Sequence, residues 1–128
     1  MNIEHMALNV AEPAKMAEWY VHNLGMKIVR QPPGDTQTHF IADESGKVIL
    51  EIYRHGTAAI PNYAAMDPFI LHIAFSTADV KGVREKLLAA GGASAGDVTV
   101  TPAGDVMTFV RDPWGVTVQL VKRAKALL

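Results

Sequence analysis

The chain contains no cysteine, which excludes disulfide bonds, thiolate metal ligands and cysteine nucleophiles. It also lacks an excess of either charge. The formal net charge is -1 with neutral histidines, so nothing marks the protein for nucleic acid or an anionic membrane. No apolar run reaches the roughly 18 residues that a membrane-spanning helix requires, and no basic segment followed by an apolar run resembles a signal peptide. These absences lead us to expect a cytoplasmic protein with no nucleic-acid or membrane partner.

Several catalytic motifs are missing as well. The sequence has no H-E-x-x-H helix, no phosphate-binding G-x-x-x-x-G-K-[ST] loop and no G-x-G-x-x-G dinucleotide fingerprint. It has three serines and no G-x-S-x-G motif, so a serine nucleophile is not expected. The remaining candidates for catalytic or metal-binding residues are the histidines and carboxylates.

What the sequence does contain is typical of one globular domain. A chain of 128 residues can bury a single core, and 49% hydrophobic with 20% charged residues is an ordinary globular composition. A strand, helix and three strands are predicted twice, in modules at 1–54 and 69–128. Residues 55–68, with two prolines, four alanines and no clear period, are predicted to be a linker.

Local patterns predict the elements of both modules. Pro13 opens the first helix in its first turn, and Gly25 ends it as a left-handed cap. Asp79 is predicted to cap the second helix, which the glycine pair at 91–92 ends. Strands are expected at 3–10, 26–31, 37–43 and 47–54, and again at 69–76, 97–101, 105–111 and 116–122.

The two modules also repeat residue by residue. A shift of 67 residues superposes their first strands, so that Ile3, His5, Ala7 and Asn9 fall on Ile70, His72, Ala74 and Ser76. Phe40 meets Phe109 at a shift of 69, and Glu51 meets Gln119 at a shift of 68. Small length changes in turns account for the differences in shift.

The alignment of Glu51 with Gln119 does not fit the spacing from the preceding turn. Gly46 to Glu51 is five residues, whereas Gly115 to Gln119 is four. A difference of one residue reverses the face on which a strand side chain lies. Equivalence of Glu51 and Gln119 therefore requires hairpin turns of different type, or a β-bulge in one strand.

Alternation along the strands brings polar side chains together. His5 and His72 share strand faces with small residues, while the larger apolar side chains lie on the opposite faces, which we expect to pack against the helices. Glu51 and Gln119 lie in apolar strands, where a lone carboxylate is costly unless it is paired or binds a cation.

Two imidazoles, one carboxylate and one amide oxygen make a mixed nitrogen and oxygen ligand set. We therefore predict a metal site formed by His5, Glu51, His72 and Gln119. Such a set suits one divalent ion, either nickel, zinc, cobalt, manganese or iron, and leaves positions for water or substrate. Taken singly, each residue has an ordinary structural explanation, and amides are weak ligands. A metal site is favoured because the four residues occupy matching positions in the two modules.

The chain resembles the vicinal oxygen chelate superfamily, which includes glyoxalase I, bleomycin-binding proteins and extradiol dioxygenases. The resemblance rests on the paired modules, the two histidine-bearing strands and the Asp-Pro-Trp-Gly turn at 112–115 before Gln119. It implies an α+β fold of two βαβββ modules, each a curved mixed sheet with a helix on its outer face, forming a cup around a central site. It also implies metal ligands on the first and last strands of each module, here His5, Glu51, His72 and Gln119.

Within that superfamily, the His5, Glu51 and His72 pattern is most similar to glyoxalase I. Glyoxalase I is a lyase/isomerase that moves a proton between adjacent carbons through a metal-stabilised enediolate. The resemblance implies a small-molecule substrate, one divalent metal ion and a homodimer. Gln119 stands where glyoxalase I normally has glutamate, which leaves Glu51 as the catalytic base of the ligand set.

Two other activities of the superfamily stay open. A metal-free protein of the bleomycin-binding type would line its cup with aromatic side chains, for which the candidates are Trp19, Tyr20, Tyr53, Tyr63 and Trp114. Of these, Trp19 and Tyr20 are expected to pack the helix instead. An iron-dependent extradiol dioxygenase fits less well, because it requires glutamate where Gln119 stands. The sequence does not identify the substrate, nor whether modules pair within one chain or between two.

Overall fold

The computed structural model describes residues 1–47 and 49–127. The chain divides into two compact units, Met1–Pro61 and Asn62–Leu128, and the division lies within the segment expected to be a linker. We refer to these as unit 1 and unit 2.

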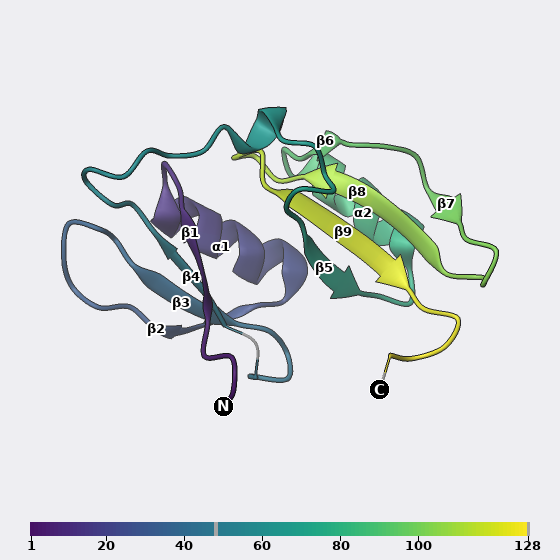
Figure 1. Ribbon diagram of the computed structural model, residues 1–128, viewed down its shortest axis with the longest axis horizontal. Helices are drawn as coiled ribbons and strands as arrows, with labels where there is room; N and C mark the ends of the chain where they lie inside the picture. Colours follow the sequence, from purple (N-terminus) through teal and green to yellow (C-terminus); the bar gives the residue numbers. More distant parts are fainter. Residues whose placement is uncertain (48, 128) are drawn as a thin grey trace. The chain divides into compact units, whose positions relative to one another are not determined.

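Unit 1 is an open four-stranded sheet with one helix (Figure 1). Its elements are β1 (Met6–Asn9), α1 (Pro13–Leu24), β2 (Lys27–Arg30), β3 (His39–Ala42) and β4 (Ile49–Tyr53). The order across the sheet is β1-β4-β3-β2, with β1 parallel to β4 and the other pairs antiparallel. The helix and the β2–β3 hairpin supply the long crossover that a parallel pair requires.

Unit 2 repeats this topology in five strands. Its elements are η1 (Tyr63–Ala65), β5 (Ile73–Ser76), α2 (Val80–Ala89), β6 (Ala93–Ser94), β7 (Thr99–Val100), β8 (Val106–Arg111) and β9 (Thr117–Lys122). The order is β5-β9-β8-β6, β5 is parallel to β9, and β7 also pairs with β8. The predicted α+β fold with two modules of the same order is confirmed. No helix in the part of the chain described is long and apolar enough to cross a membrane.

Both helices begin and end as their capping residues predict. Pro13 lies in the first turn of α1, and Gly25 closes the helix in a left-handed conformation with a φ of 70°. The Asp79 side chain accepts a hydrogen bond of 2.9 Å from the Gly82 backbone N–H at the start of α2. Each helix packs on its own sheet and buries an apolar face, so that Tyr20 and Leu87 are fully buried.

The strands are shorter than the sequence pattern predicts. The first strand of each unit begins three or four residues late, at Met6 instead of residue 3 and at Ile73 instead of residue 69. Each is an edge strand with a single parallel partner, and in the observed register residues 3 and 69–71 would lie opposite positions before that partner begins. In unit 2 a turn precedes the strand, since the Asp67 carbonyl accepts from the Ile70 N–H at 2.9 Å.

The strand expected at 97–101 is also different. The edge of unit 2 consists of two short strands, β6 and β7, which both pair with β8 and are separated at residues 95–98. Unit 1 has a related irregularity, a register shift in β2 between Ile28 and Arg30. Edge strands tolerate such interruptions because they bond on one side only.

The hairpin loops resolve the mismatch between the two repeats. Ala42 pairs with Ile49 across the first loop, and Arg111 pairs with Thr117 across the second. Six residues separate the paired positions of the first hairpin and five separate those of the second, a difference of one residue. The extra residue therefore lies between the strands, and no bulge is needed in β4 or β9. Val48 is outside the described residues.

A half-buried arginine fastens the start of unit 2 to its sheet. The Arg111 guanidinium donates to the Tyr63 carbonyl at 2.9 Å and to the Met66 carbonyl at 2.6 Å. It also donates to the Gly115 carbonyl at 3.1 Å. These bonds hold η1 against the β8–β9 loop, where the Gly115 backbone closely approaches Ala64.

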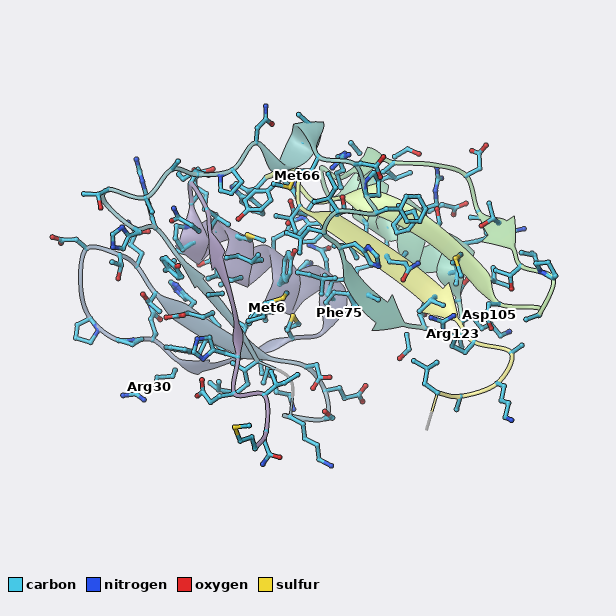
Figure 2. The ribbon with its side chains drawn as sticks, in the orientation of Figure 1. Met6, Arg30, Met66, Phe75, Asp105 and Arg123 are labelled. Carbon is cyan, nitrogen blue, oxygen red and sulfur yellow. The ribbon has the colours of Figure 1, made fainter. Side chains whose placement is uncertain are left out.

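The chain after β9 is held by one carboxylate. Figure 2 shows Asp105 and Arg123 facing each other, with Arg123 Nη1 2.6 Å from Asp105 Oδ2. The Ala124 backbone N–H donates to the other Asp105 oxygen at 2.9 Å. We call the segment after β9, residues 123–127, the C-terminal tail, and these contacts the Asp105 latch.

Two glycines at matching turn positions provide a controlled test of the Ala64 contact. Gly46 and Gly115 each donate to the carbonyl three residues earlier and have φ values of 70° and 88°. A Cβ on Gly115 would lie 2.5 Å from the Ala64 nitrogen, whereas a Cβ on Gly46 meets nothing within 4 Å. We expect Gly46→Ala to lower the free energy of unfolding by roughly 1 kcal/mol. Gly115→Ala should cost roughly 2–4 kcal/mol in urea denaturation. Equal losses would contradict the close approach.

The Asp105 latch should also open at low pH. Its hydrogen bond from Ala124, followed by that from Arg123, holds the pKa of the Asp105 carboxyl below its ordinary value of 3.8. The stabilising contribution is therefore present above pH 3.8 and is lost as the pH falls through the lowered pKa. We expect the Ala124 amide resonance to move with a midpoint below 3.8 in an NMR titration. In Asp105→Asn this acid transition should disappear, and its persistence would show that another group is responsible.

Candidate metal centre

In unit 1, backbone register brings a histidine and a carboxylate together. Ala7 of β1 pairs with Glu51 of β4, and His5 lies two residues before Ala7 on the same face. The resulting separation between His5 Nε2 and Glu51 Oε2 is 3.2 Å. Both side chains are partly exposed, 34% for His5 and 22% for Glu51, so a solute can reach them.

A second carboxylate sets the electrostatics of His5. Its Nδ1 donates to the Glu4 carboxylate, and this bond is the main reason that the pKa of His5 lies above its ordinary value of 6.5. Partial desolvation opposes the shift, while the charges of Glu4 and Glu51 add to it. His5 therefore lies between two acceptors, one at each ring nitrogen. To bind a metal through Nε2, it must release the proton on that atom.

In unit 2, the same register places a histidine and an amide together. Ala74 of β5 pairs with Gln119 of β9, and His72 lies two residues before Ala74. His72 Nδ1 is 2.8 Å from the Pro68 carbonyl oxygen. Because a carbonyl only accepts, Nδ1 carries the proton, which leaves the lone pair of Nε2 available. The Gln119 amide is nearly buried and donates to Met107 Sδ at 3.7 Å, a weak bond.

A phenylalanine completes the arrangement in each unit. Phe40 pairs with Glu51, and Phe109 pairs with Gln119. Each phenylalanine meets the histidine of its unit edge to face, at centroid distances of 5.7 Å for His5 and 5.4 Å for His72. We call His5, Phe40 and Glu51 the first half-site, and His72, Phe109 and Gln119 the second half-site. The sequence repeat matched the two phenylalanines but gave no reason to assign them to a site.

Two of the five aromatic side chains considered for the lining of a cup are buried. Tyr20 is fully buried on α1, and Tyr63 is buried in η1 beneath the Arg111 bonds. Both therefore serve packing. Phe69, which sequence analysis did not select, is 81% exposed and contacts Phe109 at a centroid distance of 5.6 Å. Its position in the Asp67 turn, and not in a strand, could not be read from the apolar pattern.

The remaining histidines lie outside both half-sites. His39 faces the helix side of its sheet, is 3% exposed, and has Nδ1 2.6 Å from the Gln37 carbonyl oxygen. His55 accepts from the Thr57 and Ala58 backbone N–H groups and shapes the loop after β4. The Nδ1 atoms of both histidines therefore bond to nearby backbone groups and not to residues of the half-sites.

Each half-site offers two potential ligands. Within residues 1–47 and 49–127, three or more histidine and acidic side chains do not gather in one group that could hold a metal. Nitrogen and oxygen donors of this kind suit a divalent transition metal, which usually takes four or more ligands. Each half-site by itself therefore supplies fewer donors than such an ion usually takes.

Comparison with known proteins gives a consistent family. A model of the Glyoxalase/Bleomycin resistance protein/Dioxygenase superfamily matches residues 2–120. A lactoylglutathione lyase of Arabidopsis thaliana is 28% identical over 130 residues, covering 93% of this chain but 43% of that protein. A probable lactoylglutathione lyase of Vibrio cholerae is 27% identical over 131 residues, covering 97% of this chain and 92% of that protein. The chain thus spans less than half of the plant relative.

Solved structures share the fold. A glyoxalase I mutant of Zea mays has a TM-score of 0.74 at 22% identity, covering 97% of this chain and 46% of that one. An antibiotic binding protein of Streptomyces has a TM-score of 0.68 at 22% identity, covering 97% of this chain and 99% of that one. The topology of both units and the family match over residues 2–120 agree: the chain belongs to the Glyoxalase/Bleomycin resistance protein/Dioxygenase superfamily.

Proposed function

We propose that the chain is a metal-dependent lyase/isomerase of the glyoxalase I type, acting on a small-molecule substrate. The observation that carries this proposal is the first half-site, where His5 Nε2 and Glu51 Oε2 are 3.2 Å apart. The relatives named lactoylglutathione lyase, at 28% and 27% identity, support the same class of activity.

The geometry of the donors fits a metal ion. Two atoms that each lie about 2.1 Å from an ion, at right angles to one another, are about 3.0 Å apart. The His5–Glu51 separation of 3.2 Å is close to that value. In the second half-site, the Pro68 bond fixes the ring tautomer of His72 that leaves Nε2 free, as metal-binding histidines require.

We infer that His5, Glu51 and His72 hold one divalent ion, with Gln119 as a weak, neutral fourth ligand. Nickel, zinc, cobalt, manganese and iron all suit these donors. Such an ion, when bound, supplies Lewis acidity toward oxygen atoms of the substrate. The two half-sites come together either within one chain or between the chains of a homodimer.

Glu51 is the residue that moves the proton in this proposal. Its carboxylate is partly exposed and lies beside Phe40 in the sheet, so a substrate carbon can reach it. A proton taken from one carbon can be returned to the adjacent carbon by the same carboxylate. Gln119 holds the matching register position but has no acid–base function, so only one side of the site carries a base.

A second candidate function rests on the aromatic cluster of unit 2. Phe69 and Phe109 meet at 5.6 Å, and Phe69 is largely exposed beside the second half-site. Exposed aromatic rings favour stacking with a planar ligand. A metal-free binding protein, of the kind represented by the antibiotic binding protein of Streptomyces, would use this surface. Ligand binding that is unchanged by a chelator would favour this candidate.

Metal content gives the first test. After anaerobic purification or reconstitution, elemental analysis should find one divalent ion per chain. His5→Ala and His72→Ala should each weaken metal affinity at least about tenfold, since even the loss of an outer-shell partner has that effect. His22→Ala, a change on the exposed surface of α1, is the matched control and should retain the metal. The absence of stoichiometric metal after reconstitution would exclude the proposal.

A charge exchange between the half-sites gives the second test. Glu51→Gln should lower kcat for hemithioacetal isomerisation by about 100-fold or more, because it removes the only carboxylate among the four proposed ligands. The double variant Glu51→Gln with Gln119→Glu moves the carboxylate to the register-equivalent position. We expect it to recover part of the lost kcat at saturating metal. A Glu51→Gln variant with full activity would show that Glu51 is not the base.

A further inference from the structure

The two half-site faces end differently. In unit 1, Asn9 follows His5 and Ala7 along the same face, and its amide fastens the loop after β4. Asn9 Nδ2 donates to the Ala58 and Ala59 carbonyls at 3.1 and 3.2 Å. Its Oδ1 accepts from the His55 backbone N–H at 2.8 Å. The loop at 55–59 is therefore drawn onto the end of this face.

In unit 2 the matching end stays open. Ser76 replaces Asn9 in the repeat, and its register partner is Val121, as Tyr53 is for Asn9. The chain after β9 is fastened to Asp105 by the latch, and not to Ser76. A pocket of about 700 Å³ remains between β5, β9 and the C-terminal tail. Residues that line it include Ala74, Ser76, Val121, Lys122, Ala126 and Leu127.

The pocket continues the face of the second half-site. Ala74, at one end of its lining, pairs with Gln119, and Ser76 pairs with Val121 two residues further along. Two residues of a strand span about 7 Å. A molecule whose reacting atoms lie at Gln119 therefore reaches the pocket with a chain of a few atoms.

The lining has the chemistry of a site for an anion on an apolar chain. The walls consist largely of alanine, valine and leucine side chains, and no acidic side chain lines the pocket. The Arg123 charge is neutralised by Asp105, but Lys122 forms no ion pair within the part of the chain described. The Lys122 ammonium and the Ser76 hydroxyl are both hydrogen-bond donors suited to a carboxylate.

We propose that this pocket is the subsite for the part of the substrate remote from the metal, and that it takes a short apolar chain ending in a carboxylate. Its role in catalysis rests on the proposed function. Its preference for a carboxylate rests on the lining alone and is measurable without a metal.

The test uses the full chain, freed of metal with EDTA, and two probes of equal length, hexanoate and 1-hexanol. NMR amide shifts should show saturable hexanoate binding at residues 74–78 and 121–127. Hexanol should bind the same residues about fivefold more weakly, because it lacks the charge that pairs with Lys122. Equal affinities, or shifts centred elsewhere, would overturn the proposal.

Two lysines provide matched variants. Lys122→Gln should abolish the preference for hexanoate while leaving hexanol binding unchanged. Lys125→Gln removes the same charge from the C-terminal tail at a residue outside the pocket lining, and should keep the preference. A loss of the preference in both variants would indicate general electrostatic attraction. Ala126→Leu, which fills the pocket from an exposed position, should weaken both probes.

The outcomes separate this inference from the proposed function. Hexanoate binding at the pocket in a protein that takes up no metal would retain the subsite and exclude the lyase/isomerase proposal. Stoichiometric metal binding without a hexanoate preference would exclude the carboxylate subsite and leave the lyase/isomerase proposal standing. Because the probes are measured without metal, a failure of one proposal does not obscure the other.

Discussion

The parallel pairing of the first and last strands in each unit is the constraint on which the rest of the structure depends. It places Ala7 beside Glu51, and Ala74 beside Gln119, although more than forty residues separate the members of each pair. A parallel neighbour cannot be reached through a tight turn, so the helix and the intervening strands form the crossover. Because the histidine lies two residues before the alanine on the same face, this one register defines both half-sites. Each helix packs on the opposite face of its sheet, and His5 and Glu51 are partly exposed whereas Gln119 is buried.

Much of this architecture was predictable because it is encoded locally. Pro13, Gly25 and Asp79 mark helix ends through their own backbone preferences, which do not depend on distant residues. The residue-level repeat correctly paired Phe40 with Phe109. Strand limits were not predictable in the same way. β1 and β5 begin where their partners allow, and the edge of unit 2 is interrupted, which depends on tertiary pairing and not on the apolar pattern.

The candidate site shows a similar limit. Repeat and strand alternation selected His5 and Glu51, and the structure brings their side chains to 3.2 Å. The bond from His72 to the Pro68 carbonyl could not be predicted, since it depends on a turn that replaces the expected strand. Tyr20 packs the helix as expected, but the choice of Tyr63 as a lining residue was wrong, because hydrophobic surface alone does not distinguish a packing residue from a ligand contact. The pocket beside Ser76 was missed because its small side chains match no motif.

The repeated strand register gives the two half-sites the same layout but different chemistry. Glu51 and Gln119 hold matching positions, so unit 1 carries a carboxylate where unit 2 carries a neutral amide. The closed end at Asn9 likewise corresponds to the open end at Ser76. Under the proposed function, a substrate would meet its base at unit 1 and room for its remote part at unit 2, so its two ends would not be interchangeable.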